Sequence, residues 1–394
     1  MRILYLADIR FPLERANGLQ TFETCRALAA RGHAVTLVVR TDTMRPGRDP
    51  YLFYGGAREA SLTISRVPSL PGPPLRRGAY LSAAIARAVS SGPDVLFTRD
   101  LGIADLVLRL PRTLRPPVVF ESHGYAPVVA IERPAALGGG APPSPSKLAR
   151  LTRRESRVWR RAAGYVTLTR VHQQELEDRF GPRANSAVVP DGVRLPPTRT
   201  RMPLAAGSPF TIAYAGHLYP WKGVDVVIDA LAALPEARLR IIGGHPGEFD
   251  HVRLDEQARQ RGVDARITFT GWLPPTSVAA ELAQAHALVL PNTRTLVSER
   301  YTSPLKLFEY LAAGRPIVAS DLASLREVLR HEENALLVEP GSAPALAAAL
   351  TRLRDEPALS ERLATQAFAD AAHYGWETRA ERLSLVIDSA RGPA

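Results

Sequence analysis

The sequence predicts an α/β protein of two domains, each built around a parallel β-sheet. Short apolar runs that fit buried strands alternate with helical patterns along most of the chain, and this alternation is typical of parallel sheets with right-handed crossovers. The chain has 394 residues, which is more than one hydrophobic core usually organises. A Pro-rich polar stretch at residues 196–208 separates two such series and is predicted to be a linker.

The domain boundaries follow from these series. We expect a first domain at residues 1–195 and a second domain at residues 209–375. Residues 376–394 are predicted to form a C-terminal helix that packs back on the first domain. Open parallel sheets bind ligands at the carboxyl ends of their strands, so we expect a ligand cleft between the strand ends of the two domains.

The first domain opens with a predicted βαβ unit. Its parts are a strand at 2–7, a helix at 20–31 and a strand at 33–39, and an Asn17-Gly18 turn opens the helix. The turn lacks the GxGxxG pattern, so a dinucleotide fingerprint is absent. Further strands are predicted at 62–67, 94–98, 118–121, 164–167 and 187–189.

Two segments of the first domain differ from the rest in composition. Residues 134–147 are rich in Gly, Pro and Ser and are predicted to form a loop. Residues 148–162 form an amphipathic, Arg-rich pattern that predicts a helix. Such a helix fits either a solvated face or a surface that lies against anionic lipid.

The second series repeats the alternation of strands and helices. Helices are predicted at 224–234, within 248–261, at 278–285 and at 305–313. The predicted strands are 210–215, 238–242, 267–269, 287–290 and 316–319.

The net charge of +11 is concentrated in the first domain. Residues 1–195 carry 29 Lys+Arg and 16 Asp+Glu, a net charge of +13, and the remaining residues carry 21 and 23, a net charge of −2. A basic half indicates an anionic partner. The arginines are scattered and no aromatic-interleaved nucleic-acid motif accompanies them, so we favour an anionic membrane surface over nucleic acid.

The cysteine content and the length of the apolar runs exclude several kinds of protein and of site. Cys25 is the single cysteine, which excludes an intrachain disulfide and a cysteine-based metal cluster, and its helical spacing from Phe22 favours a buried thiol. No apolar run reaches the length that spans a membrane. The N-terminus enters a strand directly and shows no signal-peptide pattern, so we expect a cytoplasmic protein, with any membrane contact peripheral.

The stretch from Ser303 to Val328 carries the clearest local pattern. Ser303 is a predicted N-cap, with Pro304 at the first helical position. The helix is predicted to end at Gly314, and a buried strand follows. Apolar residues recur at helical spacing and leave three side chains off the apolar stripe: Lys306, Glu309 and Tyr310.

Lysine is rare in this chain. Of the 50 basic residues only Lys147, Lys222 and Lys306 are lysines. Where arginine is the default cation, a lysine indicates a place that needs a compact ammonium group. Lys222 and Lys306 each lie beside a predicted helix start, where backbone N–H groups and an ammonium group together suit phosphate.

These segments together resemble the retaining, nucleotide-sugar-dependent glycosyltransferases of family 4. The resemblance covers the whole chain and is strongest from Val188 to Val338, through YAGHLYPWKG and SPLKLFEYLAAGRPIVAS. Val189–Val193 resembles the segment that ends the first domain of that family, and Phe120–Gly124 resembles its acceptor-side histidine segment. The fold that the resemblance implies is GT-B, with two Rossmann-like domains.

The resemblance also implies roles for particular residues. His123, Lys222 and Glu309 would be the catalytic set: His123 would bind the donor sugar, Lys222 would neutralise the leaving diphosphate, and Glu309 would accept the ribose hydroxyls. The base of the nucleotide would lie against the loop Gly271, Trp272 and Leu273. The remaining donor-binding positions would be Gly18, Gly216, His217, Tyr301, Ser303, Pro304, Leu305 and Lys306.

Two positions depart from the family's pattern. The acidic residue that usually lies eight positions before Glu309 is Tyr301, and Glu299 is the nearest carboxylate. His217 stands where the family commonly has an arginine. We therefore leave open whether Tyr301 or Glu299 addresses the donor sugar, and we expect diphosphate binding to depend mainly on Lys222.

We expect a metal-independent enzyme that transfers a sugar from a UDP- or GDP-sugar to an acceptor hydroxyl with retention. The acceptor would be a lipid-linked or saccharide molecule of cell-envelope polysaccharide, glycolipid or glycoconjugate synthesis, and no cofactor would be needed. Two alternatives remain open at this point. One is a nucleotide-sugar epimerase of the same architecture, and the other is a non-catalytic protein that binds anionic surfaces.

Overall fold

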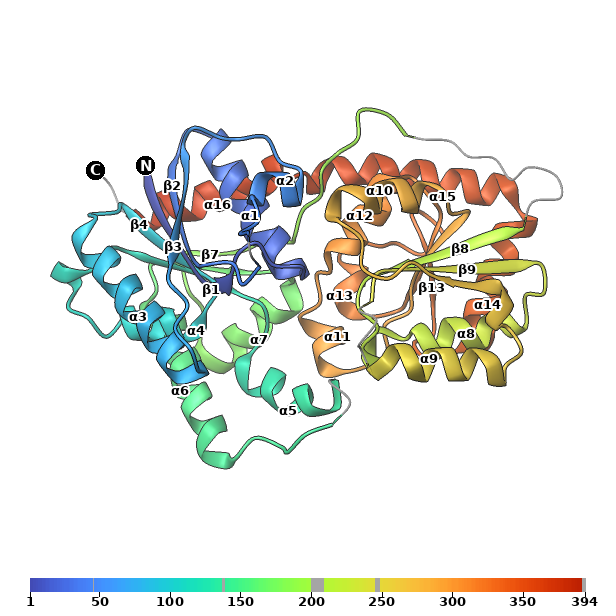
Figure 1. Ribbon diagram of the computed structural model, residues 1–394, viewed down its shortest axis with the longest axis horizontal. Coiled ribbons are helices and arrows are strands. Elements are labelled where there is room, and N and C mark those ends of the chain that lie inside the picture. Colours follow the sequence, from blue (N-terminus) through green and yellow to red (C-terminus); the bar gives the residue numbers. More distant parts are fainter. Residues whose placement is uncertain (45, 137–138, 200–208, 245–248, 392–394) are drawn as a thin grey trace. The chain divides into compact units, whose positions relative to one another are not determined.

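The computed structural model describes residues 1–44, 46–136, 139–199, 209–244 and 249–391 (Figure 1). Most of the predicted linker at 196–208 lies outside the described residues. The chain divides into two compact units. The first comprises Met1–Ala130, Pro143–Asp191 and Trp376–Ala394, and the second comprises Ile131–Pro142 and Gly192–Gly375.

The first unit is built on a seven-stranded parallel sheet with strand order β3-β2-β1-β4-β5-β6-β7. The order reverses between β1 and β4, which creates a topological switch point where open sheets bind ligands. Buried apolar side chains line most of these strands, as sheets covered on both faces require. The strands are β1 (Arg2–Arg10), β2 (Ala34–Arg40), β3 (Leu62–Val67), β4 (Val95–Thr98), β5 (Val118–Ser122), β6 (Gly164–Thr167) and β7 (Ser186–Val188).

Helices cover both faces of this sheet. Figure 1 shows α1 (Ala16–Ala30) and α16 (Trp376–Arg391) on one face, with α3 (Pro73–Ser90), α4 (Leu101–Val107) and α6 (Pro145–Arg161) on the other. The C-terminal helix α16 therefore packs within the first unit, against α1 and β6. The remaining helices are α2 (Pro50–Tyr54), α7 (Arg170–Phe180) and the first part of α5 (Ala126–Ala136).

The second unit has a six-stranded parallel sheet with order β10-β9-β8-β11-β12-β13. Its switch point lies between β8 and β11. Side chains of β8 alternate between the two faces: Ile212 and Tyr214 join one apolar cluster, and Ala213 and Ala215 join the other. The strands are β8 (Phe210–Ala215), β9 (Ala237–Ile242), β10 (Ile267–Phe269), β11 (Ala287–Leu290), β12 (Ile317–Ser320) and β13 (Leu336–Val338).

The helices of the second unit lie on both faces of its sheet. One apolar cluster includes α8, α9 and α14, and the other includes α10, α12 and α15. The end of α5 groups with this unit, where the Glu132 carboxylate accepts the N–H groups of Leu296 and Val297 at the start of α11. The helices are α8 (Val224–Ala232), α9 (Phe249–Gln260), α10 (Pro275–Ala283), α11 (Leu296–Arg300), α12 (Leu305–Ala313), α13 (Ala323–Arg326), α14 (Ala343–Asp355) and α15 (Pro357–Ala371).

The start of α12 corrects two predictions. Pro304 is the N-cap residue, so Ser303 is not the cap. Lys306 and Tyr310 are buried rather than off the apolar stripe, because α12 packs against both the sheet and α15. The Tyr310 hydroxyl accepts the backbone N–H of Ala215 at 2.7 Å, which explains how a phenol is tolerated there. The predicted end of the helix is confirmed, since Gly314 has φ 61°.

Two predicted loops are shorter than expected. The Gly/Pro/Ser-rich loop at 134–147 is helical at both ends, because α5 continues to Ala136 and α6 begins at Pro145. Ser144 caps α6 by accepting the N–H of Lys147, and residues 137–138 lie outside the described residues. Gly18 is inside the first turn of α1 rather than in a loop before it.

Within the described part of the chain, no helix is both long and apolar enough to cross a membrane.

Candidate active site

Two loops meet at the switch point of the second unit. One follows β8 and runs to Gly223, and the other follows β11. The N–H of Thr293 donates to the carbonyl oxygen of Trp221 at 3.0 Å. Gly223 has φ +71°, and a Cβ there would overlap the carbonyl oxygen of Pro291, so only glycine allows the loops to approach this closely.

Lys306 lies beneath the first of these loops, and its ammonium group has no hydrogen-bond partner among the described residues. The side chain comes from the first turn of α12 and the residue is 8% exposed. Its Nζ lies 3.7 Å from the ring centroid of Tyr214, a cation–π contact. A Cβ at Gly216 would lie 3.1 Å from this Nζ, so glycine at that position leaves room for the ammonium group.

Lys222, at the end of the loop that follows β8, supplies a second ammonium group. Its Nζ lies 3.5 Å from the ring centroid of Trp221. Burial lowers the pKa of Lys222 to about 7. Burial and the charge of Lys222 together hold the pKa of Lys306 well below its usual range. The two ammonium groups therefore lie within the range of electrostatic interaction, and each is in contact with an aromatic ring.

Glu309 and Asn292 add two polar groups with unused hydrogen-bonding capacity. Glu309 lies three positions after Lys306 on α12, and its carboxylate makes no hydrogen bond with the described residues. Burial raises the pKa of Glu309 to about 7, partly offset by the charge of Lys306. Asn292 follows β11, is fully buried, and has neither its amide nitrogen nor its oxygen bonded within the described chain. Asn292 was missed in the sequence because an Asn after a strand is usually a turn residue.

The other predicted residues of the second unit occupy its carboxyl edge. His217 stacks on Tyr219 with ring centroids 5.2 Å apart. Ser303 and Pro304 are partly buried directly before α12, and Leu305 is buried at its start. Tyr301 is buried at the C-terminal end of α11.

The base-side loop follows β10, two strands from β8. The carbonyl oxygen of Gly271 accepts the N–H of Gly243 at 3.1 Å, and Trp272 is 36% exposed. Leu273 packs on an apolar cluster of the second unit.

Glu299 has a structural role in the second unit. One carboxylate oxygen accepts from Arg294 at 2.5 Å, and the other accepts the N–H of Ala323 at 3.1 Å at the start of α13. Of the two candidates for the usual acidic position, Glu299 is therefore already engaged by the protein.

In the first unit, His123 follows β5 and is held by a buried carboxylate. Its Nε2 lies 2.6 Å from Oε1 of Glu121, and its side chain is 25% exposed. Glu121 also accepts from Gln20 Nε2 at 2.6 Å and pairs with Arg379 of α16. Arg379 and Gln20 gave no sequence signal, because both lie on helices where a polar residue is usually solvated.

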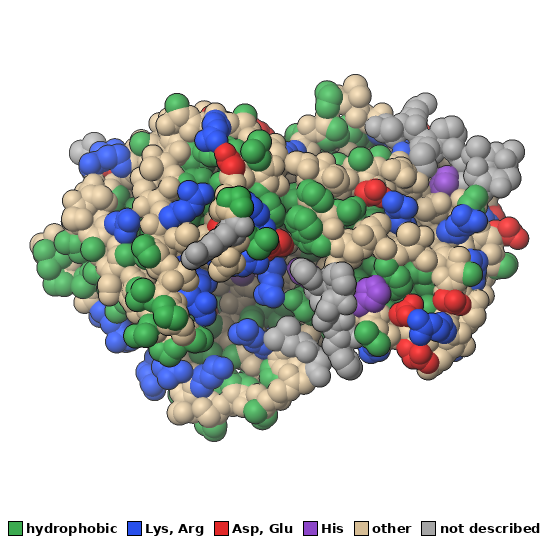
Figure 2. Space-filling model, in the orientation of Figure 1, with side chains coloured by type: hydrophobic (Ala, Val, Ile, Leu, Met, Phe, Trp, Pro, Cys, Tyr) green, Lys and Arg blue, Asp and Glu red, His purple; other side chains and the backbone are tan. Residues whose placement is uncertain are grey.

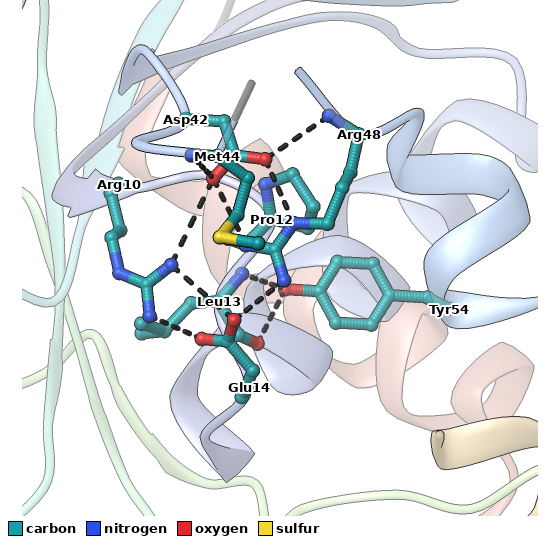
Figure 3. A network of polar contacts seen from close by, with 8 residues as sticks. All are labelled: Arg10, Pro12, Leu13, Glu14, Asp42, Met44, Arg48 and Tyr54. Carbon is teal, nitrogen blue, oxygen red and sulfur yellow. Dashed lines mark hydrogen bonds and ion pairs between the residues drawn. The ribbon is translucent and has the colours of Figure 1, made fainter. Parts of the chain in front are cut away.

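Gly18 has a packing role that the sequence did not reveal. A Cβ there would overlap the Tyr54 hydroxyl and lie 2.5 Å from the carbonyl oxygen of Leu13. The same hydroxyl accepts the N–H of Leu13 at 2.7 Å and donates to its carbonyl oxygen at 2.9 Å. Tyr54 therefore holds the loop after β1 against the start of α1 (Figure 3).

An ionic network fixes the same loop from its other side. Arg48 donates to Asp42 at 2.8 Å and 2.9 Å, to Glu14 at 2.5 Å and to the carbonyl oxygen of Pro12 at 3.0 Å (Figure 3). Arg10 pairs with Glu14 as well. Burial acts against ionisation, but the hydrogen bonds from Arg48 lower the pKa of Asp42 to about 2, so the network stays charged near neutral pH.

Comparison with known proteins gives a consistent result over both units. Residues 18–192 match the family described as "Glycosyl transferase 4-like domain", and residues 209–356 match "Glycosyl transferases group 1". A D-inositol 3-phosphate glycosyltransferase of Xylanimonas cellulosilytica is 31% identical over 297 residues, covering 71% of this chain and 68% of that protein. The chain belongs to glycosyltransferase family 4. The family inferred from the sequence motifs is thereby confirmed.

Further similarities agree with this family-4 glycosyltransferase. A glycogen synthase of Mycobacterium tuberculosis is 27% identical over 429 residues, covering 99% of this chain and 95% of that protein. The structure of Anabaena HepE in complex with UDP-glucose matches with a TM-score of 0.74 and 18% identity, covering 99% and 100% of the two chains. The fold is GT-B, as predicted.

Among the described residues of this glycosyltransferase, no group of three or more His, Cys, Asp or Glu side chains could hold a metal ion. The side chains described above near the carboxyl ends of the strands are cations, amides, a histidine and single carboxylates. Such groups bind anions and hydroxyls.

Proposed function

We propose that this glycosyltransferase moves a sugar from a nucleotide diphosphate sugar to an acceptor hydroxyl, with retention of configuration at the anomeric carbon. The observation that carries the proposal is the pair of ammonium groups of Lys222 and Lys306. Each ammonium group lies against an aromatic ring, and that of Lys306 has no hydrogen-bond partner among the described residues. Burial and then the charge of Lys222 lower the pKa of Lys306. A diphosphate supplies the missing negative charge.

Two neighbouring ammonium groups are unfavourable in the free protein, but they favour binding of a diphosphate. One buried and one partly buried ammonium group repel each other and lose hydration, so an anion that completes the site favours their charged forms. The N-terminus of α12 adds backbone N–H groups beside Lys306. When the bond between sugar and diphosphate breaks, negative charge grows on the leaving phosphate, and these groups stabilise it. We propose that they replace a metal ion, so no metal cofactor is required.

Glu309 is proposed to bind the ribose of the nucleotide. An ionised carboxylate accepts two hydrogen bonds, which suits a pair of neighbouring hydroxyls. Its position three residues from Lys306 puts the carboxylate and the ammonium group on neighbouring positions of one helix. This spacing favours a ligand with a diphosphate next to a sugar diol, as in a nucleoside diphosphate.

The donor and acceptor classes are proposed from the relatives. HepE was solved with UDP-glucose, which favours a UDP-sugar over a GDP-sugar. His123 is proposed to bind a hydroxyl of the transferred sugar. The names of the relatives include an inositol phosphate and glycogen, so a saccharide or lipid-linked acceptor of envelope glycoconjugate synthesis is proposed.

We also propose a peripheral, cytoplasmic-side contact with anionic lipid through α6. On the face shown in Figure 2, basic side chains outnumber acidic ones over the elements of the first unit, whereas both signs mix over the second. Arg154 and Arg157 pair with Asp105. The other basic residues of α6 are exposed: Lys147, Arg150, Arg153, Arg160 and Arg161. The buried face holds Val158 and Trp159, so the contact would be electrostatic rather than inserted.

The test of the donor site is calorimetric titration with UDP and GDP on the wild type and Glu309→Ala. We expect one nucleotide to bind and Glu309→Ala to weaken it at least about tenfold, because a charge-assisted hydrogen-bond acceptor is lost. Glu256→Ala, on the exposed face of α9, is the control and should bind normally. If neither nucleotide binds the wild type at millimolar concentration, the proposal is wrong.

Retention and lipid contact need their own measurements. The anomeric configuration of the product, read by proton NMR, decides between retention and inversion. Binding to vesicles with and without anionic lipid, compared with a variant in which Arg150, Arg153 and Arg160 are replaced by Gln, tests α6. Equal binding to both vesicle types would refute the membrane contact.

A further inference from the structure

We propose that Glu121, held by Arg379 of the C-terminal helix, is the positioning residue for His123. It keeps the His123 ring in the form whose Nε2 carries the proton, so that Nδ1 is an acceptor for a sugar hydroxyl. The inference rests on the proposed function in one respect, namely that His123 meets a sugar.

The carboxylate of Glu121 is surrounded by donors. It is fully buried, and its Oε1 lies 2.6 Å from both His123 Nε2 and Gln20 Nε2, while Oε2 pairs with Arg379. Arg99 Nη1 donates to Gln20 Oε1 at 2.6 Å, and this contact orients the Gln20 amide with its NH₂ group toward Glu121. A carboxylate in this position can only accept hydrogen bonds, so Nε2 of His123 must be the donor.

Arg379 holds the other oxygen in place. It is 3% exposed, and its Nη1 donates to the carbonyl oxygens of Val189 and Pro190, each at 2.9 Å. Its Nε donates to Thr24 Oγ1 at 3.4 Å. With partners on three sides, the planar guanidinium group has one available orientation. A residue of α16 thereby fixes a carboxylate of β5 from within the same unit.

The charges agree with this assignment. Burial alone would raise the pKa of Glu121, but the charge of Arg379 and the hydrogen bond from His123 hold it well below its usual range. Burial and the charge of Arg99 lower the pKa of His123 to about 4, although Glu121 acts in the opposite direction. The groups that interact with this pair include Arg99, Arg379 and Gln20. Further titratable groups nearby are Asp191, Tyr5 and Cys25, which interact with Glu121, and His172, which interacts with His123. At neutral pH the ring is uncharged, with one proton, and that proton is on Nε2.

Nδ1 is then the nitrogen that is available to substrate. It makes no hydrogen bond with the described residues, and a quarter of the side chain is exposed. A lone pair on Nδ1 accepts from a hydroxyl but cannot donate a proton to a leaving oxygen. The arrangement assigns His123 to recognition of a donor-sugar hydroxyl rather than to general acid catalysis.

The test reads the protonation of the ring directly. The whole chain is labelled with ¹⁵N-histidine, and the His123 signals are identified by their loss in His123→Asn. Two-bond ¹H–¹⁵N correlations at about pH 7 distinguish the two neutral forms and the cation. We expect the form protonated at Nε2. A ring protonated at Nδ1, or an imidazolium, would overturn the inference without any variant of Glu121 having to fold.

Two variants then test whether the protonation form of the His123 ring affects the rate of sugar transfer. Glu121→Gln should let the ring exchange between its two neutral forms and lower kcat/KM for sugar transfer at least about tenfold, while nucleotide affinity stays within about twofold of the wild type. Glu155→Gln removes another buried carboxylate of this unit, which bonds Ala126 N and Tyr165, and should leave the His123 signals unchanged. Unaltered turnover in a folded Glu121→Gln would overturn the inference.

The two proposals fail in different ways. If the donor proposal is wrong, UDP and GDP do not bind, yet the ring signals of His123 still report its form. If the donor binds and is turned over but the ring has the other form, only the role of Glu121 is wrong.

Discussion

The ammonium group of Lys306 lies 3.7 Å from the centre of the Tyr214 ring and bonds to no other polar group among the described residues. A buried cation in this state costs stability, since the cation–π contact returns on the order of 2 kcal/mol, less than the several kcal/mol of hydration free energy that a buried ion loses. The presence of a lysine at this position is therefore better explained by ligand binding than by a contribution to folding stability. Ligand affinity and the free energy of unfolding can be measured separately.

Lys306→Met should weaken nucleotide binding and leave folding intact. We expect at least about a tenfold loss of affinity, with a free energy of unfolding that stays the same or rises, because an unpaired buried charge is removed. Calorimetry and urea denaturation measure the two effects. Lys147→Met, at the exposed third lysine, is the control and should change neither. A marked loss of stability without a loss of affinity would show that Lys306 is a structural residue.

Nucleotide affinity should be highest near pH 7. Burial lowers the pKa of Lys222 to about 7 and raises the pKa of Glu309 to about 7. Above pH 7 the free protein loses the Lys222 proton that the diphosphate needs, and below pH 7 it gains a proton on the carboxylate that the ribose needs. Both changes weaken binding, so affinity falls on either side.

Calorimetry from about pH 5.5 to 8.5 checks this profile. In Glu309→Gln the acidic side of the profile should become shallower, because only the terminal phosphate of the nucleotide, whose pKa is about 6, still titrates there. The alkaline side should remain. Titrations above pH 7 in two buffers of different ionisation enthalpy should show proton uptake on binding. An affinity that is independent of pH across this range would contradict the assignment of both groups.

Features that depend on neighbouring residues in the chain could be predicted from the sequence. The strands at Leu62–Val67 and Phe210–Ala215 are predicted to the residue, because an apolar run between polar turns is sufficient to define a buried strand. The scarcity of lysine drew attention to Lys222 and Lys306, whose charges interact in the folded protein. The strand Leu336–Val338 was missed, although the equally short strand Ile267–Phe269 was predicted.

Other features depend on partners that are far apart in the sequence. Arg379 meets Glu121 across 258 positions, and the hydroxyl of Tyr54 meets Leu13 across 41. No spacing rule predicts such pairs. The Ser303 cap was wrong for a related reason, because tertiary packing of α12, rather than its capping residue, decides where the helix begins.

Gly18→Ala should destabilise the first unit. The added methyl group would overlap the Tyr54 hydroxyl and press on the Leu13 carbonyl oxygen, and overpacking of this kind typically costs about 1–3 kcal/mol. Tyr54→Phe removes the two hydrogen bonds to Leu13 and should cost about 1 kcal/mol on its own. Because it also removes the nearest of the three atoms that would clash, the double variant should be more stable than the sum of the single effects predicts. Urea denaturation of the four proteins measures this coupling, and strict additivity would contradict the packing role of Gly18.

Glu155→Gln should make the stability of the protein less dependent on pH. Glu155 is fully buried on α6, and burial raises its pKa to about 7, against the opposing hydrogen bonds of Ala126 and Tyr165. A raised carboxyl pKa means that the folded state holds a proton which the unfolded state has released between about pH 4.5 and 7. In the wild type this group therefore lowers the free energy of unfolding as pH rises through that window.

The amide side chain introduced by Glu155→Gln keeps an oxygen for the Ala126 N–H and carries no charge to desolvate. At pH 8 the variant should therefore be more stable than the wild type by about 2 kcal/mol, and the difference should shrink toward pH 5. Glu381→Gln, at an exposed position of α16, serves as the control for loss of one carboxylate. Urea denaturation at pH 5, 6.5 and 8 measures the free energy of unfolding of the variant minus that of the wild type. If this difference falls between pH 5 and pH 8, Glu155 is ionised and favourably bound in the folded protein, and the prediction is wrong.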